Sequence, residues 1–258
     1  MSKNVVFIPN IDLGDNRNKS YKYSINSWKH FCDKYDCELI VWKDLLLPVE
    51  KMKITWQRYY MFDILEANNV DYDQILIVDA DTIVHPECPN FFTETNGKYC
   101  AVRNNGSFEW VRRSMNGFSK LLFPGDIPFK VWDYINCGFQ IVNKDHKEFF
   151  EYVRNFYFDN QQPIQDAIAT VSAGTDQTII NYLLRFQNIE INYLPICYNL
   201  QDLCSKQLLM LHDSMWWITD ELIFKDCGYV FHFNAIPQNP MNRDANYWIK
   251  RTYEEFYR

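Results

Sequence analysis

The chain has 258 residues, enough to bury roughly 70–75% of its unfolded surface, and no Pro-, Gly- or Ser-rich linker divides it, so we expect a single domain. A net charge of −7 and a pI of about 5.3 argue against a general binder of nucleic acid or of anionic membranes. No apolar stretch approaches the roughly 18 residues of a transmembrane helix, and the first residues do not have the pattern of a signal peptide.

The eight cysteines contain no C-x-x-C pair and no spacing typical of a zinc site. Several of them stand within apolar runs, as buried free thiols do. Free thiols are typical of proteins in reducing compartments. The sequence therefore predicts a soluble protein of the cytoplasm.

The chain begins with the pattern of a β-α-β unit, which opens a doubly wound nucleotide-binding fold. Strands are expected at 5–8 and 38–42. The helix between them is predicted by apolar residues that share one helical face: Tyr21, Ile25, Trp28 and Cys32. Asn18 or Ser20 is expected to cap this helix. Neither a G-x-G-x-x-G fingerprint nor a P-loop is present.

A second helix is expected at 54–67, where apolar side chains recur at i,i+4 and Arg58 is an interior cation. It leads into 75–78, a run of apolar and mostly β-branched residues that favours a strand buried on both faces. Asp79 and Asp81 follow at once, and in extended backbone their side chains point to the same face. Two such carboxylates suit a hard divalent cation, Mn2+ or Mg2+, although aspartates also simply end strands.

Four further strands are expected, at 99–102, 134–142, 189–194 and 229–233. The second of them contains Gly138, and a glycine inside a strand often marks the close approach of a ligand or of another backbone. The last carries His232 among apolar neighbours. Taken alone, such a histidine is more often a core residue with a satisfied hydrogen bond than a metal ligand.

Three further helices are expected: one over the apolar face of 149–156, one that begins at Thr175, and one that runs from about Asn246. Between the strands, the stretch 104–130 contains several glycines and prolines. It is therefore expected to form long loops with short helices, and such loops beside a site commonly carry specificity.

Five short segments in this order resemble the GT-A class of nucleotide-sugar glycosyltransferases. The likeness is strongest to the glycogenin-like and bacterial lipopolysaccharide galactosyltransferase group, and it extends to the plant and fungal α-xylosyl and α-galactosyl enzymes. The segments are Trp56-Gln57-Arg58-Tyr59, Asp79-Ala80-Asp81, Ile135-Asn136-Cys137-Gly138-Phe139, Asp176-Gln177 and His232-Phe233. Each segment alone is weak evidence for the family, but the five occur in the right order and together span most of the chain.

The resemblance implies an α/β fold of the GT-A, Rossmann-like type: one domain with a mixed, mainly parallel central sheet flanked by helices. Its nucleotide-binding half would be about 1–103 and its acceptor-binding half about 104–258. The implied activity moves a hexose or pentose from a nucleotide-diphosphate sugar, expected to be a UDP-sugar, to a hydroxyl of a glycan or another acceptor. Mn2+, or Mg2+, would be the cofactor.

By the same resemblance, Asp79 would contact the ribose and the metal, Asp81 would chelate the metal, and His232 would be the third protein ligand. Asn10 would lie near the nucleotide base. Arg58 would lie near the donor diphosphate or sugar. These assignments place the nucleotide at the ends of the first and third expected strands.

The sugar side of the implied site contains Asn136 and Gly138, which would line the sugar and the acceptor. Asp176 and Gln177 would lie beneath the donor sugar as the catalytic residues. If configuration is retained, Gln177 is expected under the anomeric carbon while Asp176 orients sugar hydroxyls. The sequence leaves retention and inversion open.

The sequence departs from the resembled group after His232, where a glycine and then a diphosphate-binding lysine would be expected. Arg243 and Lys250 are the candidates to replace that lysine. If configuration is inverted, a carboxylate must activate the acceptor, and Asp126 or Asp133 could supply it.

Other classes of protein share parts of this pattern. A haloacid-dehalogenase-type phosphatase also carries an apolar strand followed by Asp-x-Asp, a pattern that Asp79 and Asp81 match. That family has the motif on the first strand of its core, whereas two β-α units precede it here. It also needs a later acidic pair for the metal. A sugar nucleotidyltransferase would need a Gly-rich, basic loop near Gly14, which the sequence lacks. A catalytically inactive sugar-binding domain is the third alternative, and the presence of all three metal-ligand candidates argues against it.

Overall fold

The apolar runs of the first part of the chain form the parallel half of a six-stranded sheet. The computed structural model describes residues 3–104, 106–125, 127–201, 203, 207–215, 221–236 and 243–258. In it, β1 (Lys3–Pro9) lies between β2 (Glu38–Trp42) and β3 (Tyr72–Val78), and both pairings are parallel. The first and third strands are buried on both faces, as the runs of apolar residues predicted.

The other half of the sheet contains its one reversed strand. β6 (Ile135–Asn143) pairs antiparallel with both β3 and β5 (Tyr99–Arg103), and β7 (Ile191–Leu194) runs parallel to β5 at the edge. The resulting order is β2-β1-β3-β6-β5-β7. This mixed, mainly parallel sheet within a single α/β domain confirms the predicted fold class.

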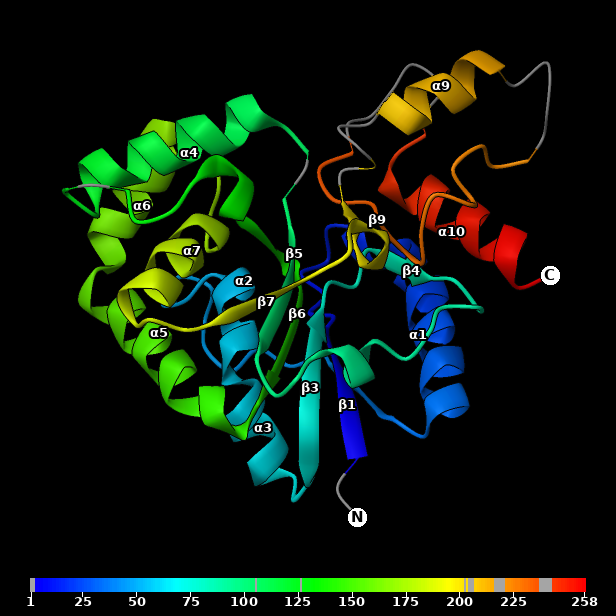
Figure 1. Cartoon of the computed structure of the whole chain (residues 1–258), viewed down its shortest axis with the longest axis horizontal. Coiled ribbons are helices and arrows are strands. Elements are labelled where there is room, and N and C mark those ends of the chain that lie inside the picture. The colour runs from blue at the N-terminus through cyan, green and yellow to red at the C-terminus, as the bar shows by residue number, and fades with distance from the viewer. Residues whose placement is uncertain are drawn as a thin grey trace.

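Alternate residues of the central strands enter two separate apolar cores, because successive side chains of a strand point to opposite faces. One core packs against α1 (Tyr21–Tyr35) and α10 (Ala245–Phe256). The other packs against α3 (Met61–Ala67), α5 (Lys147–Asp159) and α7 (Gln177–Phe186). Figure 1 shows these two groups of helices on opposite sides of the sheet.

The helix predicted at 54–67 is present but has a tighter turn in its middle. α2 (Ile54–Gln57) is followed by the 3-10 turn η2 (Arg58–Tyr60) and then by α3. Within this turn, Arg58 donates from Nε to the carbonyl oxygen of Thr55 at 2.9 Å. A short 3-10 stretch inside a helix often marks a functional position, and this one carries the predicted cation.

The stretch 104–130 differs from the expectation of long loops, because it contains the long helix α4 (Phe108–Leu121). Ser107 caps the helix by accepting a hydrogen bond from the backbone N–H of Trp110 at 3.2 Å. Gly117, which suggested a loop, instead lets α6 (Gln161–Val171) approach closely, since a Cβ atom there would lie 2.3 Å from Val171. The glycine therefore serves helix packing and does not break the helix.

The predicted cap of α1 is also different. Ser20 stands at the cap position, but its side chain makes no capping hydrogen bond, and the turn η1 (Arg17–Ser20) precedes the helix. The side chain of Asn18 instead donates to Asn10 Oδ1 at 2.6 Å and to the carbonyl oxygen of Ile11 at 3.1 Å. This region ties the end of β1 to the start of α1.

A small second sheet, in the order β4-β9-β8, lies beside α1 and α10 (Figure 1). Its strands are β4 (Thr82–Val84), β8 (Leu200–Gln201) and β9 (Val230–His232), and α9 (Gln207–Met215) follows β8 in the chain. The remaining short turns are η3 (Phe91–Glu94), η4 (Val131–Asp133), η5 (Lys144–His146) and η6 (Ile196–Tyr198). Of these elements, the sequence predicted only β9.

Among the described residues, no helix combines the length and the apolar character needed to cross a membrane. The described cysteines are free thiols, and Cys204 lies outside the described residues.

Candidate active site

The turn after β3 is fixed from both sides. The backbone N–H of Asp79 donates to the carbonyl oxygen of Gly138 in β6 at 3.0 Å. The hydroxyl of Thr82 donates to the carbonyl oxygen of Asp79 at 2.7 Å, and itself accepts from the indole N–H of Trp28 in α1 at 2.8 Å. The two aspartates therefore stand on a constrained backbone at the carboxyl end of a central strand, where open α/β sheets bind ligands.

His232 reaches this turn through the small sheet. The antiparallel register of β4 and β9 places Thr82 opposite His232, and the N–H of Phe233 donates to the carbonyl oxygen of Asp81 at 2.9 Å. As a result, His232 Nε2 lies 3.2 Å from Asp81 Oδ1 and 3.5 Å from Asp79 Oδ2. The predicted trio is thus assembled, with its potential ligand atoms within 4.8 Å of one another.

A chain of amide hydrogen bonds fixes the protonation of the histidine ring. The backbone N–H of Gly138 donates to Asn136 Oδ1 at 2.9 Å, and Asn199 Nδ2 donates to the same oxygen at 3.0 Å. The oxygen of Asn199 must therefore face His232 Nδ1, which lies 3.1 Å away. An oxygen can only accept, so Nδ1 carries the hydrogen.

This arrangement fits a divalent cation. His232 Nε2 is buried and forms no hydrogen bond with any described residue. This nitrogen faces two carboxylates, and loss of its proton would expose a lone pair toward them. A metal-bound histidine typically donates its other ring N–H to an oxygen, here that of Asn199. Two carboxylate oxygens and one imidazole nitrogen could bind a divalent metal such as Mn2+, leaving further positions for a ligand.

The charge of Asp79 is balanced by Arg58. Its Nη1 pairs with Asp79 Oδ1 at 2.5 Å and also lies 3.3 Å from the carbonyl oxygen of Cys137. Burial raises the pKa of the Asp79 carboxyl, but Arg58 and then His232 outweigh burial and hold this pKa well below its usual range. Burial lowers the pKa of His232, but Asp81 and Asp79 outweigh it and raise that pKa to about 9.

Gly138 is required by the space around the cluster. A Cβ atom at this position would lie 2.3 Å from His232 Cε1 and 2.8 Å from Asp79 Oδ2. Both distances are far inside van der Waals contact, so any side chain would move two of the potential ligands. The close approach that the glycine predicted is therefore the approach of the cluster itself.

The cluster stands in the wall of a cleft of about 610 Å3, next to a second cavity of about 70 Å3. The predicted residues that line the larger cleft are Arg58, Asp79, Asn136, Gly138, Asp176, Gln177 and His232. The predicted residues that line the smaller cavity are Asn10, Arg58, Asp79 and Asp81. The structure thus brings all of the predicted site residues to two adjoining cavities.

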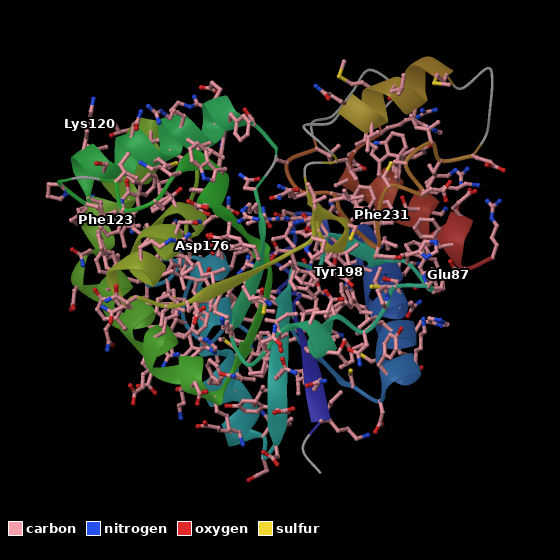
Figure 2. All side chains as sticks on the ribbon, viewed as in Figure 1. Glu87, Lys120, Phe123, Asp176, Tyr198 and Phe231 are labelled. Carbon is pink, nitrogen blue, oxygen red and sulfur yellow. The ribbon has the colours of Figure 1, made fainter. Side chains whose placement is uncertain are left out.

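Asp176 and Gln177 line the larger cleft from the start of α7. In Figure 2, Asp176 lies on the left of the view and Phe231 of β9 on the right. The Asp176 carboxylate accepts hydrogen bonds from Tyr59 and Thr175, both at 2.7 Å. Gln177 Oε1 accepts from the backbone N–H of Cys137 at 3.1 Å. These contacts hold both side chains in place before any ligand binds.

Other sequence candidates lie elsewhere. Arg243 pairs with Asp213, and Lys250 lies 3.7 Å from Glu254, so neither lines the two cavities. Asp133 is in η4 and does not line them either. Asp126 lies outside the described residues.

Two residues of the site were not found from the sequence. Asn199, which holds the histidine ring, precedes a strand too short to show a periodic pattern. Arg17 lines both cavities from a polar loop, where an arginine has no distinguishing local signal. To identify either residue from the sequence, one would need to know which distant segments of the chain meet in the fold.

No protein-family model and no curated protein matches the sequence. Several solved structures, however, share its fold. A glycosyltransferase involved in the glycosylation of the major capsid of PBCV-1 matches 96% of this chain and 98% of its own, with a TM-score of 0.60 and 12% identity. The glycosyltransferase GlyE of Streptococcus pneumoniae TIGR4 matches 98% of this chain, with a TM-score of 0.52 and 14% identity, and the match spans 60% of the GlyE chain.

Mouse xyloside xylosyltransferase 1 matches 92% of this chain and 100% of its own, with a TM-score of 0.53 and 13% identity. The structural neighbours are thus glycosyltransferases, and at these identities the likeness establishes a common fold. This confirms the fold that the sequence resemblance implied.

Replacing Asn199 by Leu should weaken Mn2+ binding about 10- to 100-fold, the usual effect of losing a residue that orients a metal-bound histidine. The Asn199→Asp variant keeps an oxygen opposite His232 Nδ1 and should retain more of the affinity. Isothermal titration calorimetry with Mn2+ on folded proteins measures both effects. Equal Mn2+ affinity of wild type and Asn199→Leu would contradict the role of Asn199.

In metal-free protein, we expect the free energy of unfolding to fall as the pH rises from about 6.5 to about 9. The folded-state pKa of His232 is about 9 against an ordinary value of 6.5, so its stabilising contribution is complete below the ordinary value and is lost as the pH passes through the folded one. The contribution is on the order of 3 kcal/mol. Urea denaturation with EDTA across this range tests it, and His232→Gln should lack this part of the pH dependence. If the free energy of unfolding changed with pH in the same way for wild type and His232→Gln, the carboxylates would not stabilise the charged ring.

Proposed function

We propose that this protein is a metal-dependent glycosyltransferase. It would move a hexosyl or pentosyl group from a nucleotide-diphosphate sugar, a UDP-sugar, to a hydroxyl of a glycan or another acceptor. The observation that carries this proposal is the cluster of Asp79, Asp81 and His232 at the carboxyl edge of the sheet, in the wall of the large cleft. The glycosyltransferase fold of the structural neighbours supports it.

The two cavities support a division of the chain into a nucleotide-binding half, about 1–103, and an acceptor-binding half, about 104–258. Every described residue that lines the smaller cavity lies between Pro9 and Asp81. The larger cleft adds residues from 104–110, 136–138, 168–177 and 232–235. The base and ribose would therefore bind near Asn10 and Asp79, and the sugar and acceptor would bind beyond the cluster.

The chemistry requires stabilisation of a leaving diphosphate. Mn2+, or Mg2+, held by Asp79, Asp81 and His232 would supply Lewis-acid stabilisation of that charge. Arg58 keeps Asp79 ionised, and the hydrogen bond from His232 Nδ1 to Asn199 keeps Nε2 directed at the carboxylates. The protein thus holds its donor atoms in position before the substrate arrives.

On the sugar side, Asp176 would orient hydroxyls of the donor, and Gln177 would lie under the anomeric carbon. Gln177 Oε1 accepts one hydrogen bond from Cys137, and its second lone pair is available to steady an oxocarbenium-like carbon. A neutral amide is a poor nucleophile. Retention would therefore proceed by attack of the acceptor on the same face that the diphosphate leaves, with the diphosphate accepting the acceptor's proton.

Two other functions compete with this one. A phosphatase of the haloacid-dehalogenase type needs a free aspartate nucleophile, whereas Asp79 is paired with Arg58 and Asp81 stands beside His232. An inactive sugar-binding domain would bind the donor without turning it over. The free thiols of the described cysteines support a reducing compartment such as the cytoplasm.

Wild-type protein with Mn2+ should release UDP from a UDP-sugar, and Asp81→Ala should lower this turnover about 100- to 1000-fold because a carboxylate of the cluster is lost. The matched control is Asp73→Ala, which removes the same charge at the exposed, opposite end of the strand region. Near wild-type, Mn2+-dependent turnover by folded Asp81→Ala would contradict the metal assignment. Binding without turnover by the wild type would favour the inactive domain.

The nucleotide itself is tested by thermal denaturation in Mn2+. UDP should raise the melting temperature, because a ligand that binds only the folded state stabilises it. Stabilisation by GDP or CDP, and not by UDP, would contradict the uridine assignment while leaving the transferase proposal standing.

Gln177→Ala should lower kcat about 10- to 1000-fold with little change in KM for the donor, the pattern for a contact made in the transition state. NMR of the product gives the decisive second measurement, the anomeric configuration. An inverted linkage would remove the proposed role of Gln177. It would direct attention to Glu109, a carboxylate that lines the larger cleft from α4.

A further inference from the structure

We propose that Arg17 binds the diphosphate of the donor, an inference that rests on the proposed function. The two cavities offer few cations for this task. Of the described Lys and Arg residues, only Arg17 and Arg58 line them, and each of these lines both. A diphosphate joins a nucleoside to a sugar, so it must pass the residues that the two cavities share.

Arg58 is already engaged by the protein. Its guanidinium pairs with Asp79 and contacts the carbonyl oxygens of Thr55 and Cys137. Its side chain is only 10% exposed. Breaking the ion pair to reach a phosphate would leave the Asp79 carboxylate without its main partner, which is strongly unfavourable for a buried pair. Arg58 is therefore suited to holding Asp79 in the cluster and not to binding the phosphates of a substrate.

Arg17 is in the opposite situation. Its Nε donates to the hydroxyl of Tyr21 at 3.1 Å, which orients the guanidinium. Among the described residues, its two terminal nitrogens have neither a hydrogen bond nor an ion pair, and the residue is exposed to solvent. A guanidinium with free terminal N–H groups is a fork that matches phosphate oxygens, which makes bidentate contact possible.

The backbone around Arg17 is anchored, so the fork is held at the cavity. The N–H of Arg17 donates to Asp15 at 3.0 Å, and the N–H of Ser20 donates to Asn246 of α10 at 2.9 Å. Partial shielding of the side chain from solvent works to lower the pKa of Arg17, but Tyr21, Asp81 and Asp79 outweigh it and raise this pKa, so the guanidinium stays charged. The same carboxylates that face the metal position are thus close enough to act on this cation.

The two arginines would therefore have different functions. Arg58 neutralises one carboxylate of the cluster from within the protein. Arg17 faces solvent at the junction of the cavities, where it adds a positive charge opposite the leaving diphosphate. Neither Arg243 nor Lys250, the two candidates to replace the expected lysine, lines either cavity.

The test compares Arg17→Ala with Lys19→Ala. Lys19 is an exposed cation of the same turn, it lines neither cavity, and its loss changes the net charge equally. Titration calorimetry with Mn2+ should show that Arg17→Ala weakens UDP binding about 10- to 100-fold, as expected for losing charge-assisted hydrogen bonds. Inorganic pyrophosphate should lose affinity likewise, uridine should not, and Lys19→Ala should change each less than about twofold. Arg17→Lys should lie between wild type and Arg17→Ala, because it keeps the charge without the fork.

Several results would overturn the assignment. Equal UDP affinity of Arg17→Ala and wild type would exclude the contact. An equal loss for uridine would place Arg17 at the nucleoside, and an equal loss in Lys19→Ala would reduce the effect to general charge. In each of these cases wild-type protein still binds UDP, so the proposed function survives. Wild-type protein that binds neither UDP nor pyrophosphate with Mn2+ would overturn both.

Discussion

The short ladder between β4 and β9 is the interaction on which the site depends. It joins Asp81 to Phe233 through a backbone hydrogen bond and places His232 opposite Thr82. The two strands come from distant parts of the chain, and without their pairing the aspartates would only end a strand. The pairing is set by backbone geometry, so the position of the imidazole does not rely on a flexible side chain reaching across solvent.

Around this ladder, each charged group is held by a neutral or opposite partner. Asp79 has Arg58, and His232 has Asn199, whose own orientation is set by Asn136. A buried polar group without a partner destabilises the fold, and these hydrogen bonds and ion pairs supply the partners. The same order continues in the larger cleft, where Tyr59 and Thr175 each donate a hydrogen bond to one oxygen of the Asp176 carboxylate. The site is preorganised on both sides of the sheet.

The sequence predicted those parts of this arrangement that local pattern controls. Three signals each lie within a single buried strand and could be recognised there. They are the apolar run before Asp79, the glycine at 138 and the apolar neighbours of His232. The positions of Asn199 beside His232 and of Arg17 at the two cavities were missed, because they arise only where segments far apart in the chain meet. The helix α4 was missed for a different reason, since Gly117 reads as a loop residue but serves packing against Val171.

The absence of a side chain at position 138 has a consequence for how relatives of this chain should be read. A homologue could keep Asp79, Asp81 and His232 in its sequence and still be unable to assemble them, because an alanine at 138 would displace both His232 and Asp79. The cluster could therefore be lost during evolution through a change at a position that supplies none of its potential ligand atoms. Inspection of ligand residues alone would classify such a pseudoenzyme as active, whereas a glycine at this backbone position is the more stringent marker of a working site.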